Sequence, residues 1–392
     1  MQNLHISPLG KVLFVGAAFP PSDGGSVVVM RELLRHFDSQ SYNIVTLRSL
    51  GVSNDKMLEA RTLRIGALRL RPYRISLWLR FLQMPFVLRK VSNYARDCGS
   101  RAIVCIYPTI DFLFLGCMMA KKTGLPLIVY MHDTMLEALR KTSFSWVARR
   151  LHNVLRRRVA KILVISEGMQ MFYRRRYGID STVVPHVYSE PILPFISTQV
   201  SHQLFWGGAI YGINDKALRR VLMVAKSLNI KMTVTGKSKE VVASQLRESH
   251  DSDSIDIKFY PSRSEYLRAL SVSGVMVLAL NRPDETDFGE GEISTIFPTK
   301  TPEYLASGAP ILVHCPKHYF LAEFFTRYKC GIVVEDINSG SLEVAMKKLL
   351  SNDCDVMDMR RRAKEVANYF SPKNVCDIFT KSVSKVLEGL KE

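Results

Sequence analysis

The chain has 392 residues, 47% of them apolar and 23% charged, so it is long enough for two ordinary domains with full hydrophobic cores. Its seven cysteines are odd in number and form no Cys-x-x-Cys pair, which argues against a disulfide framework or a zinc site and suits a reducing cytoplasm. Because there is no signal-peptide pattern and no apolar run of membrane-spanning length, we expect a cytoplasmic chain.

Charge is distributed unevenly along the chain. Residues 1–200 carry 28 Lys and Arg against 12 Asp and Glu, a net charge of +16, whereas residues 201–392 carry 26 against 24, a net charge of +2. This difference predicts two partners, or one partner with an anionic face. A nucleic acid is the weakest candidate, because the sequence contains no recognisable nucleic-acid-binding module.

Two basic segments, residues 61–90 and residues 149–176, supply most of the excess charge. In the first, eight Lys and Arg alternate with aliphatic and aromatic residues, which suits a segment lying on an anionic membrane surface. The alternative is an ordinary buried helix whose arginine stems cover apolar surface. We expect the membrane arrangement, and therefore a peripheral location on the inner face of the membrane.

The chain opens with the pattern of a parallel α/β domain. An apolar strand, residues 11–16, leads into a loop with Gly24 and Gly25 and then into a helix through residue 37. Paired glycines let backbone amides approach a phosphate or a sugar, although glycines at such turns are as often purely geometric. The loop is not Gly-x-Gly-x-x-Gly, which argues against NAD or FAD as a cofactor.

Further strands are predicted at residues 42–47, 102–106, 125–131 and 161–165, with helices near residues 112–121 and 145–159. The third of these strands ends in His132-Asp133. Ligand groups in open α/β sheets follow the carboxyl ends of strands, so both residues are site candidates. Prolines and weak periodicity at residues 185–200 predict an interdomain linker.

The second half repeats the alternation. A strand at residues 203–207 runs into a glycine-rich loop containing Gly208, and further strands follow at residues 231–236 and 275–280. We therefore predict two doubly wound, Rossmann-like α/β domains facing each other across a cleft. Their expected bounds are 1–195 and 196–372, and residues 373–392 are expected to form a helix that crosses back to the first domain.

The most informative stretch is Phe297 to Pro310. Thr301 suits the N-cap of a short helix, Pro302 its first position and Gly308 a left-handed C-cap. Free amides at the helix start predict an anion site for a diphosphate. Glu303, which we expect to be exposed in the first turn, either accepts hydrogen bonds from a ribose diol or merely complements the helix dipole.

The pattern Phe297-Pro-Thr-Lys-x-x-Glu-Tyr-Leu-Ala-Ser-Gly-x-Pro resembles the donor-binding signature of retaining GT-B glycosyltransferases of the fourth-family, bacterial polysaccharide type. The resemblance implies a GT-B fold and a role for Glu303 in binding the ribose of a nucleotide sugar. Tyr-Met-His132-Asp133 resembles a motif of the same family, whose histidine lies against the donor sugar.

Two departures from the family concern the diphosphate. Many members have a second glutamate where this chain has Thr295, and an Arg and a Lys after the first strand of the second domain, where Gly208 and its neighbours provide no Arg. We expect the diphosphate to be bound by basic side chains and amides instead. The candidates are Lys237, Arg282, Lys300, and the amides near Ser294 and Pro302.

The sequence thus predicts a retaining, hexosyltransferase-type glycosyltransferase that needs no metal or other cofactor. Its catalytic candidates are His132, Glu303 and Lys300. The expected acceptor is a lipid-linked or cell-surface glycan. The alternatives are a nucleotide-sugar epimerase of the same fold, or a catalytically silent protein that binds glycan or membrane.

Overall fold

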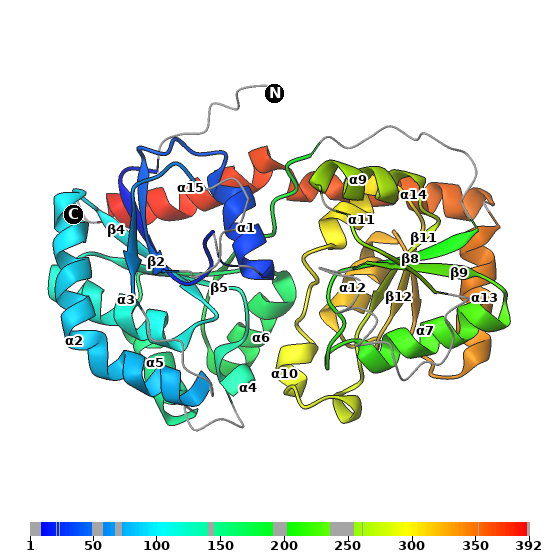
Figure 1. Cartoon of the computed structure of the whole chain (residues 1–392), viewed down its shortest axis with the longest axis horizontal. Coiled ribbons are helices and arrows are strands. Elements are labelled where there is room, and N and C mark those ends of the chain that lie inside the picture. Colours follow the sequence, from blue (N-terminus) through cyan, green and yellow to red (C-terminus); the bar gives the residue numbers. More distant parts are fainter. Residues whose placement is uncertain are drawn as a thin grey trace. The chain divides into compact units, whose positions relative to one another are not determined.

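The computed structural model describes residues 9–20, 22, 24–48, 58–66, 73–139, 145–190, 202–235, 255–260, 262–351 and 353–389. The chain divides into two compact units (Figure 1), which are Met1–Val187 with Ser371–Glu392 and Tyr188–Phe370. The first unit is therefore built from both ends of the chain, and the second is inserted between them. The expected boundaries, after residues 195 and 372, lie a few residues further along the chain.

The first unit is organised around a seven-stranded parallel sheet with the order β3-β2-β1-β4-β5-β6-β7. Its strands are β1 (Val12–Val15), β2 (Tyr42–Leu47), β3 (Thr62–Ile65), β4 (Ala102–Tyr107), β5 (Leu127–Met131), β6 (Lys161–Val164) and β7 (Thr182–Val183). Its helices are α1 (Gly25–Leu34), α2 (Tyr73–Asp97), α3 (Ile110–Thr123), α4 (Met135–Leu139), α5 (Ser145–Arg158), α6 (Glu167–Tyr177) and α15 (Pro372–Glu388).

Continuous apolar runs explain the central strands, because a parallel sheet covered by helices on both faces buries every side chain of its inner strands. All residues of β1, β4 and β5 are buried. Helix α15 belongs to the same core, since the ring of Phe379 stacks on that of Phe14 with centroids 6.1 Å apart. The last helix of the chain therefore completes the core of the first unit.

The second unit has a six-stranded parallel sheet with the order β10-β9-β8-β11-β12-β13. Its strands are β8 (Gln203–Gly207), β9 (Lys231–Thr235), β10 (Ile255–Lys258), β11 (Val275–Ala279), β12 (Ile311–His314) and β13 (Ile332–Val334). Its helices are α7 (Asp215–Ser227), α9 (Arg263–Val272), η1 (Pro283–Glu285), α10 (Glu290–Ile293), α11 (Thr301–Ser307), α12 (Phe320–Tyr328), α13 (Ser339–Leu350), α14 (Cys354–Ala367) and η2 (Asn368–Phe370).

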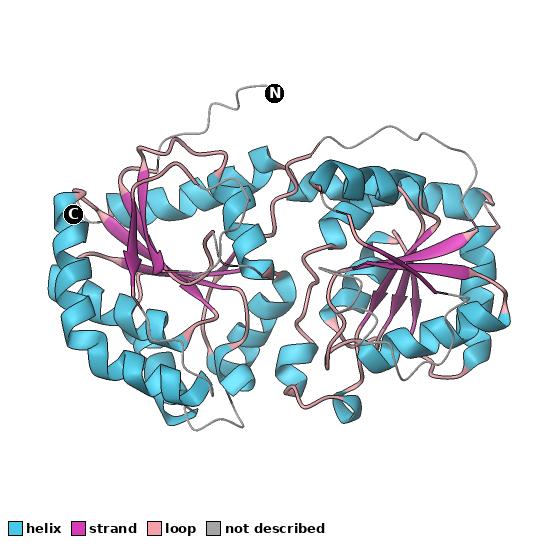
Figure 2. Ribbon diagram, viewed as in Figure 1, coloured by secondary structure: helices cyan, strands magenta, loops and turns pink. Residues whose placement is uncertain are grey.

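The predicted fold class, two doubly wound α/β domains, is confirmed, and Figure 2 shows helices on either side of each sheet. Strand order reverses between β1 and β4 in the first unit and between β8 and β11 in the second. Ligands of such sheets bind beyond the carboxyl ends of the strands at this switch point. The two switch points therefore mark the candidate ligand-binding edge of each sheet.

The basic segment of residues 61–90 does not form one surface segment as we expected. Its beginning is strand β3, which pairs with β2, and its end is the first two-thirds of helix α2. The short run Thr62–Ile65 adds an edge to the sheet, and this pairing overrides the amphipathic pattern of the whole segment. Within the described part of the chain, no helix has both the length and the apolar character needed to cross a bilayer.

Candidate functional site

The second unit presents a tightly packed glycine loop at the end of β8. A Cβ atom added to Gly207 would lie 2.5 Å from the hydroxyl oxygen of Tyr266, so no side chain fits there. The Gly207 amide donates a hydrogen bond to the hydroxyl of Tyr304 over 2.7 Å. Gly208 follows with a φ of 98°, in the region that favours glycine. Both glycines are thus required by the geometry of the loop.

Lys300 lies directly on this loop. Its Nζ donates a hydrogen bond to the Gly207 carbonyl over 2.9 Å and lies 3.0 Å from the centroid of the Trp206 ring. Burial lowers the pKa of Lys300, while the carboxylate of Glu303 acts to raise it. The carbonyl and the indole face also favour the ammonium form. The structure thereby places a cation after the first strand of this unit, where the sequence itself offered no arginine.

Helix α11 begins one residue earlier than predicted. Thr301 is its first residue rather than its N-cap, Lys300 is the cap, and Pro302 takes the second position. The shift arises because the Thr301 amide already bonds to the Pro298 carbonyl over 2.9 Å, which winds the preceding turn into the helix. With that amide engaged and no N–H on Pro302, the helix start offers fewer free amides to an anion than we expected. The C-cap prediction is confirmed, since Gly308 has a φ of 69°.

Glu303 is not the exposed residue that we expected. Its side chain is 13% exposed, and its Oε1 accepts a hydrogen bond from Nη1 of Arg263 over 2.6 Å. Tyr266 also hydrogen-bonds Glu303, and burial together with this contact raises the pKa of the tyrosine. Electrostatics at the carboxylate are therefore set by Arg263 on α9 and by Lys300, three residues earlier in the chain. The sequence did not reveal this pairing.

Arg282, Ser294 and Thr295 make other contacts. Arg282, which follows β11, has its Nε 3.8 Å from Oδ1 of Asp284, and it lines a surface groove with Lys317 and residues of α13. The Ser294 amide bonds to the Glu290 carbonyl over 2.9 Å, and the Thr295 hydroxyl donates to the Glu292 carbonyl over 3.0 Å. These amides and hydroxyls are engaged within α10. The remaining candidate, Lys237, lies outside the described residues.

Sequence reasoning also missed Asn281, which organises the glycine-rich loop. Its buried amide accepts a hydrogen bond from the Ala217 amide over 2.9 Å and donates to the Gly212 carbonyl over 3.1 Å and to Oδ1 of Asp215 over 2.7 Å. It therefore ties the loop after β8 to the start of α7. The available signal was an asparagine directly after a buried strand, at the switch point of the sheet.

In the first unit, His132 follows β5 and is buried against the ring of Tyr130, with ring centroids 4.4 Å apart. Both of its ring nitrogens are buried and have no hydrogen-bond partner within the described part of the chain. Burial, and secondly the nearby His186, lower the pKa of His132 to about 3. A neutral imidazole carries one donor and one acceptor, so this side chain has the capacity to bind a polar ligand.

His186 follows β7 and is also buried, which lowers its pKa to about 4. Asp133 is exposed next to His132. Gly24 caps α1 with a φ of 131°, and nothing lies within 4 Å of a Cβ atom added there. Gly25 is the first residue of the helix and is exposed. The first unit therefore brings uncharged imidazoles and an open glycine turn to the carboxyl edge of its sheet.

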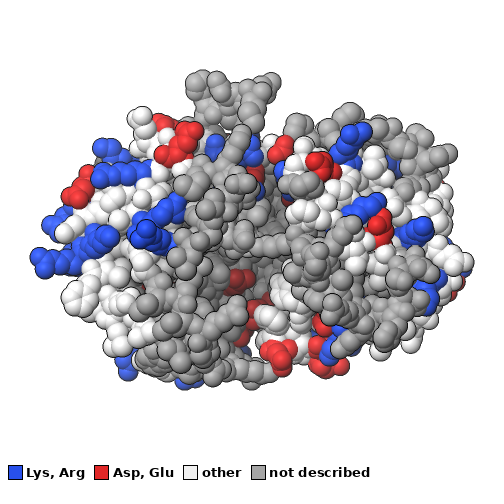
Figure 3. Space-filling model, viewed as in Figure 1, with Lys and Arg blue, Asp and Glu red and all other residues white. Residues whose placement is uncertain are grey.

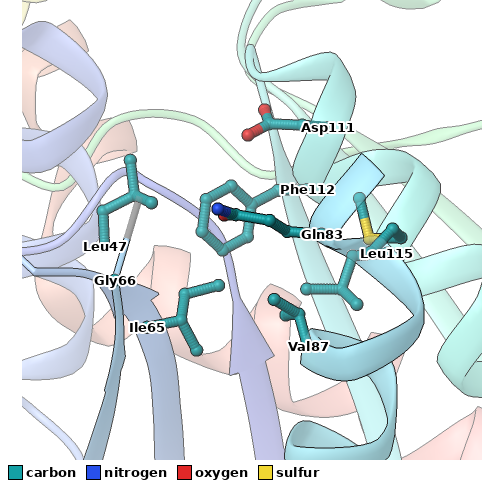
Figure 4. A pocket seen from close by; sticks show the side chains of 9 residues that line it. Leu47, Ile65, Gly66, Gln83, Val87, Asp111, Phe112 and Leu115 are labelled. Atoms are coloured by element: carbon teal, nitrogen blue, oxygen red, sulfur yellow. The ribbon is translucent and has the colours of Figure 1, made fainter. Parts of the chain in front are cut away.

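The first unit also contains an apolar pocket near the ends of β2 and β3. Figure 4 shows Leu47 and Ile65 on one side, Val87 and Leu115 on the other, and the carboxylate of Asp111 at one end. Gly66, Gln83, Met84 and Phe112 complete the lining. This pocket was not predicted, because its lining comes from two strands and two helices that are distant in sequence. Among the described residues, no cluster of three His, Cys, Asp or Glu side chains could hold a metal ion.

Comparisons with known proteins find similarity in sequence and in fold. Residues 24–186 match the model of the glycosyl transferase 4-like domain. A search of the curated proteins finds no match.

Among solved structures, sucrose-phosphate synthase from Thermosynechococcus elongatus superimposes with a TM-score of 0.70 at 12% identity, over 97% of this chain and 99% of that one. HepE from Anabaena, in complex with UDP-glucose, gives 0.68 at 12% identity over 97% and 99%. WaaG, a glycosyltransferase of lipopolysaccharide biosynthesis, gives 0.63 at 12% identity over 94% and 99%. Residues 24–186 are therefore similar to the glycosyl transferase 4-like domain, and the chain has the GT-B fold of these glycosyltransferases.

Proposed function

We propose that this protein is a glycosyltransferase that moves a sugar from a nucleotide-sugar donor to an acceptor hydroxyl. The observation that carries the proposal is the position of Lys300. Its Nζ donates a hydrogen bond to the Gly207 carbonyl, and in the sequence Lys300 precedes Glu303 by three residues. A cation at a glycine loop suits a diphosphate, and a carboxylate one turn away suits the ribose of the same nucleotide. HepE, which has the same fold, was solved with UDP-glucose, so UDP is the first nucleotide to test.

The chemistry follows from charge. Breaking the bond between the anomeric carbon and the diphosphate leaves negative charge on the phosphate oxygens and positive charge on the sugar ring. Lys300 would stabilise the diphosphate electrostatically, so no metal ion is needed for that role. Glu303 would hold the ribose, and a neutral His132 would hydrogen-bond a hydroxyl of the sugar. In a retaining reaction the acceptor oxygen bonds to the face that the diphosphate leaves, and the proton of the acceptor hydroxyl passes to an oxygen of the departing diphosphate.

We further propose a lipid-linked or cell-surface glycan as acceptor, taken at the inner face of a membrane. Helix α2 exposes Leu82 by 73% and Phe86 by 81%, beside the exposed Arg89 and Lys90. Apolar side chains flanked by cations suit an anionic lipid surface. Figure 3 shows Lys and Arg side chains gathered on the side of the first unit that carries α2.

Helix α5 provides a second basic surface. It contains no acidic residue, and Arg149, Arg150, Arg156, Arg157 and Arg158 are exposed. The Arg150 guanidinium carbon lies 5.5 Å from the centroid of the Trp146 ring, which is itself 46% exposed. An exposed tryptophan among arginines is a combination found at membrane surfaces.

The donor proposal is tested by a thermal-shift screen against UDP, GDP, CDP and dTDP. A ligand that binds the folded state raises the melting temperature by mass action, so one nucleotide should produce a clear rise at millimolar concentration. Turnover is then assayed with the sugars of that nucleotide. If none of the four nucleotides shifts the melting temperature, the donor site is wrongly assigned.

The second candidate is a silent protein of the same fold that binds glycan or membrane. Thr295 favours it, because the hydroxyl bonds to carbonyls of α10 at a position where many family members carry a carboxylate. Turnover of any nucleotide sugar excludes this candidate. A nucleotide-sugar epimerase would instead interconvert the donor without an acceptor, which the same assay reveals.

A further inference from the structure

Arg263 occupies a position where a cation is locally unfavourable. It is the first residue of α9, whose N-cap Ser262 accepts a hydrogen bond from the Glu265 amide over 3.2 Å. The positive end of a helix dipole disfavours a basic side chain in the first turn. A residue that breaks a local rule in this way is often retained for a contact made elsewhere in the fold.

That contact is the ion pair with Glu303, described above. The exposed fractions of the two side chains are 41% for Arg263 and 13% for Glu303, so the carboxylate is the buried partner. The Arg263 guanidinium also lies 5.7 Å from the centroid of the Tyr266 ring, and Tyr266 hydrogen-bonds Glu303. Helix α9 thereby holds the carboxylate of α11 from one side with two side chains.

A second cation competes for the same carboxylate. Lys300 and Glu303 are separated by three residues, close enough to interact directly across the helix start. If Glu303 turned toward Lys300, the pair would neutralise the charge at the glycine loop and remove the carboxylate from the ribose. In the structure Lys300 bonds to the Gly207 carbonyl, and Arg263 bonds to Glu303.

We propose that Arg263 is a positioning residue of the donor site, which orients Glu303 toward the ribose diol and keeps it apart from Lys300. This inference rests on the proposed function. A carboxylate oxygen has two lone-pair sites, so the oxygen bound by Arg263 can still accept a bond from a hydroxyl. Arg263 then contributes to discrimination between ribonucleotides and 2′-deoxyribonucleotides without touching the nucleotide itself.

The test compares nucleotide affinities by calorimetric titration. UDP, GDP and CDP are each titrated beside their 2′-deoxy analogues into the wild-type protein and three variants. The variants are Arg263→Met, Arg263→Lys and the control Arg268→Met, which changes an exposed position on the same helix. We expect wild type to prefer the ribonucleotide, and Arg263→Met to lose about tenfold of that preference, which corresponds to about 1.4 kcal/mol. Arg263→Lys should restore part of it, and Arg268→Met should behave like wild type.

The sugar preference separates this role from a structural one. A misfolded site would lose affinity for both sugars equally, so an unchanged ratio in Arg263→Met overturns the inference, whatever its absolute affinity. Melting temperatures without ligand show that each variant is folded. If wild type binds none of UDP, GDP, CDP and dTDP, the proposed function fails first and the inference falls with it. If wild type binds dTDP but none of the three ribonucleotides, only the inference is overturned.

Discussion

At the carboxyl end of its sheet the first unit buries two uncharged imidazoles. The second unit instead holds Lys300 and Glu303, each on a specific partner. His132 and His186 have lowered pKa values because burial penalises the imidazolium form. Burial lowers the pKa of Lys300 as well, but this amine has specific partners in the Gly207 carbonyl and the Trp206 ring, and the carboxylate of Glu303 pairs with Arg263.

Under the proposed function, the two units would contribute different chemistries. A neutral imidazole exchanges hydrogen bonds with hydroxyl groups, which suits a sugar. A fixed cation stabilises an anion that gains charge during a reaction. The glycosyltransferase proposal therefore predicts that changes in the two units affect different measurements.

Replacing Lys300 should have the largest effect on catalysis. Lys300→Met removes the cation nearest the glycine loop, and losing one electrostatic stabiliser of a developing anion typically lowers kcat by about 100- to 1,000-fold. The control is Lys317→Met, whose side chain is 76% exposed in a surface pair with Glu335. The measurement is kcat with the donor that the nucleotide screen selects. A kcat within a few-fold of wild type would remove Lys300 from the reaction.

The imidazoles of the first unit should make the fold sensitive to acid. Both folded-state pKa values, about 3 and about 4, lie below the unfolded value of 6.5. The unfolded chain therefore takes up protons first, so stability is complete above pH 6.5 and falls as the pH drops toward 4. Each imidazole should cost roughly 2 kcal/mol of unfolding free energy between pH 7.5 and 5.0.

Urea unfolding at those two pH values measures the loss. His186→Leu should lose less stability on acidification than wild type, because one of the two titrating groups is absent. His318→Gln, at a 55% exposed position in the second unit, serves as the control. Equal acid sensitivity in wild type and His186→Leu would contradict the assignment of buried neutral imidazoles.

Glu303→Gln should weaken nucleotide binding far more than folding. Charge-assisted hydrogen bonds to a diol are worth roughly 1.5–3 kcal/mol, or about 10- to 100-fold in affinity. The variant leaves Arg263 without its anion, but that side chain is 41% exposed and can be hydrated. Affinity by titration and melting temperature are measured together, with Glu343→Gln on α13 as the control. Unchanged affinity would exclude Glu303 from the site.

The charge difference between the halves of the chain predicts a smaller, salt-dependent effect on membrane binding. Each basic residue near an anionic surface contributes about 1 kcal/mol, so Arg149→Gln with Arg150→Gln should weaken binding to anionic vesicles by roughly 30-fold at low salt. Arg361→Gln, 58% exposed in the second unit, should have no effect. Sedimentation with phosphatidylserine and phosphatidylcholine vesicles measures this. Wild-type protein that ignores both would refute the membrane proposal and leave the donor site intact.

No effect is expected from removing divalent ions. If Lys300 supplies the positive charge at the diphosphate, turnover in excess EDTA should match turnover with magnesium. A loss of activity that magnesium or manganese restores would contradict metal independence and shift the role of Lys300 to binding alone.

The parts that the sequence revealed are local. Continuous apolar runs such as Leu127–Met131 identify buried strands, and Gly308 identifies the end of a helix, because both depend on a few neighbouring residues. The parts it did not reveal are contacts between distant segments. Arg263 and Glu303 are forty residues apart, and Asn281 bonds to a loop about seventy residues earlier.

The same distinction explains the incorrect predictions. Glu303 was expected to be exposed because it lies at the start of a short helix. In the structure Arg263 of α9 contacts it, and its side chain is only 13% exposed. Thr301 was expected to cap the helix because threonine is a common N-cap residue. The turn from Pro298 that continues into α11 depends on backbone angles rather than residue type, so the sequence did not reveal it. The segment of residues 61–90 was expected to lie on a membrane surface because of its basic and apolar composition. That composition does not reveal that the first part of the segment pairs as β3 with β2.

The position of α15 has a consequence for biosynthesis. A ribosome makes the second unit, Tyr188–Phe370, before it makes the helix that completes the first. Until residues 371–388 emerge, the rings of Phe14 and Phe37 lack Phe379, against which both pack. The segment synthesised first therefore reaches its final core last, and a chain truncated after residue 370 would contain all residues of the second unit but not all of those of the first.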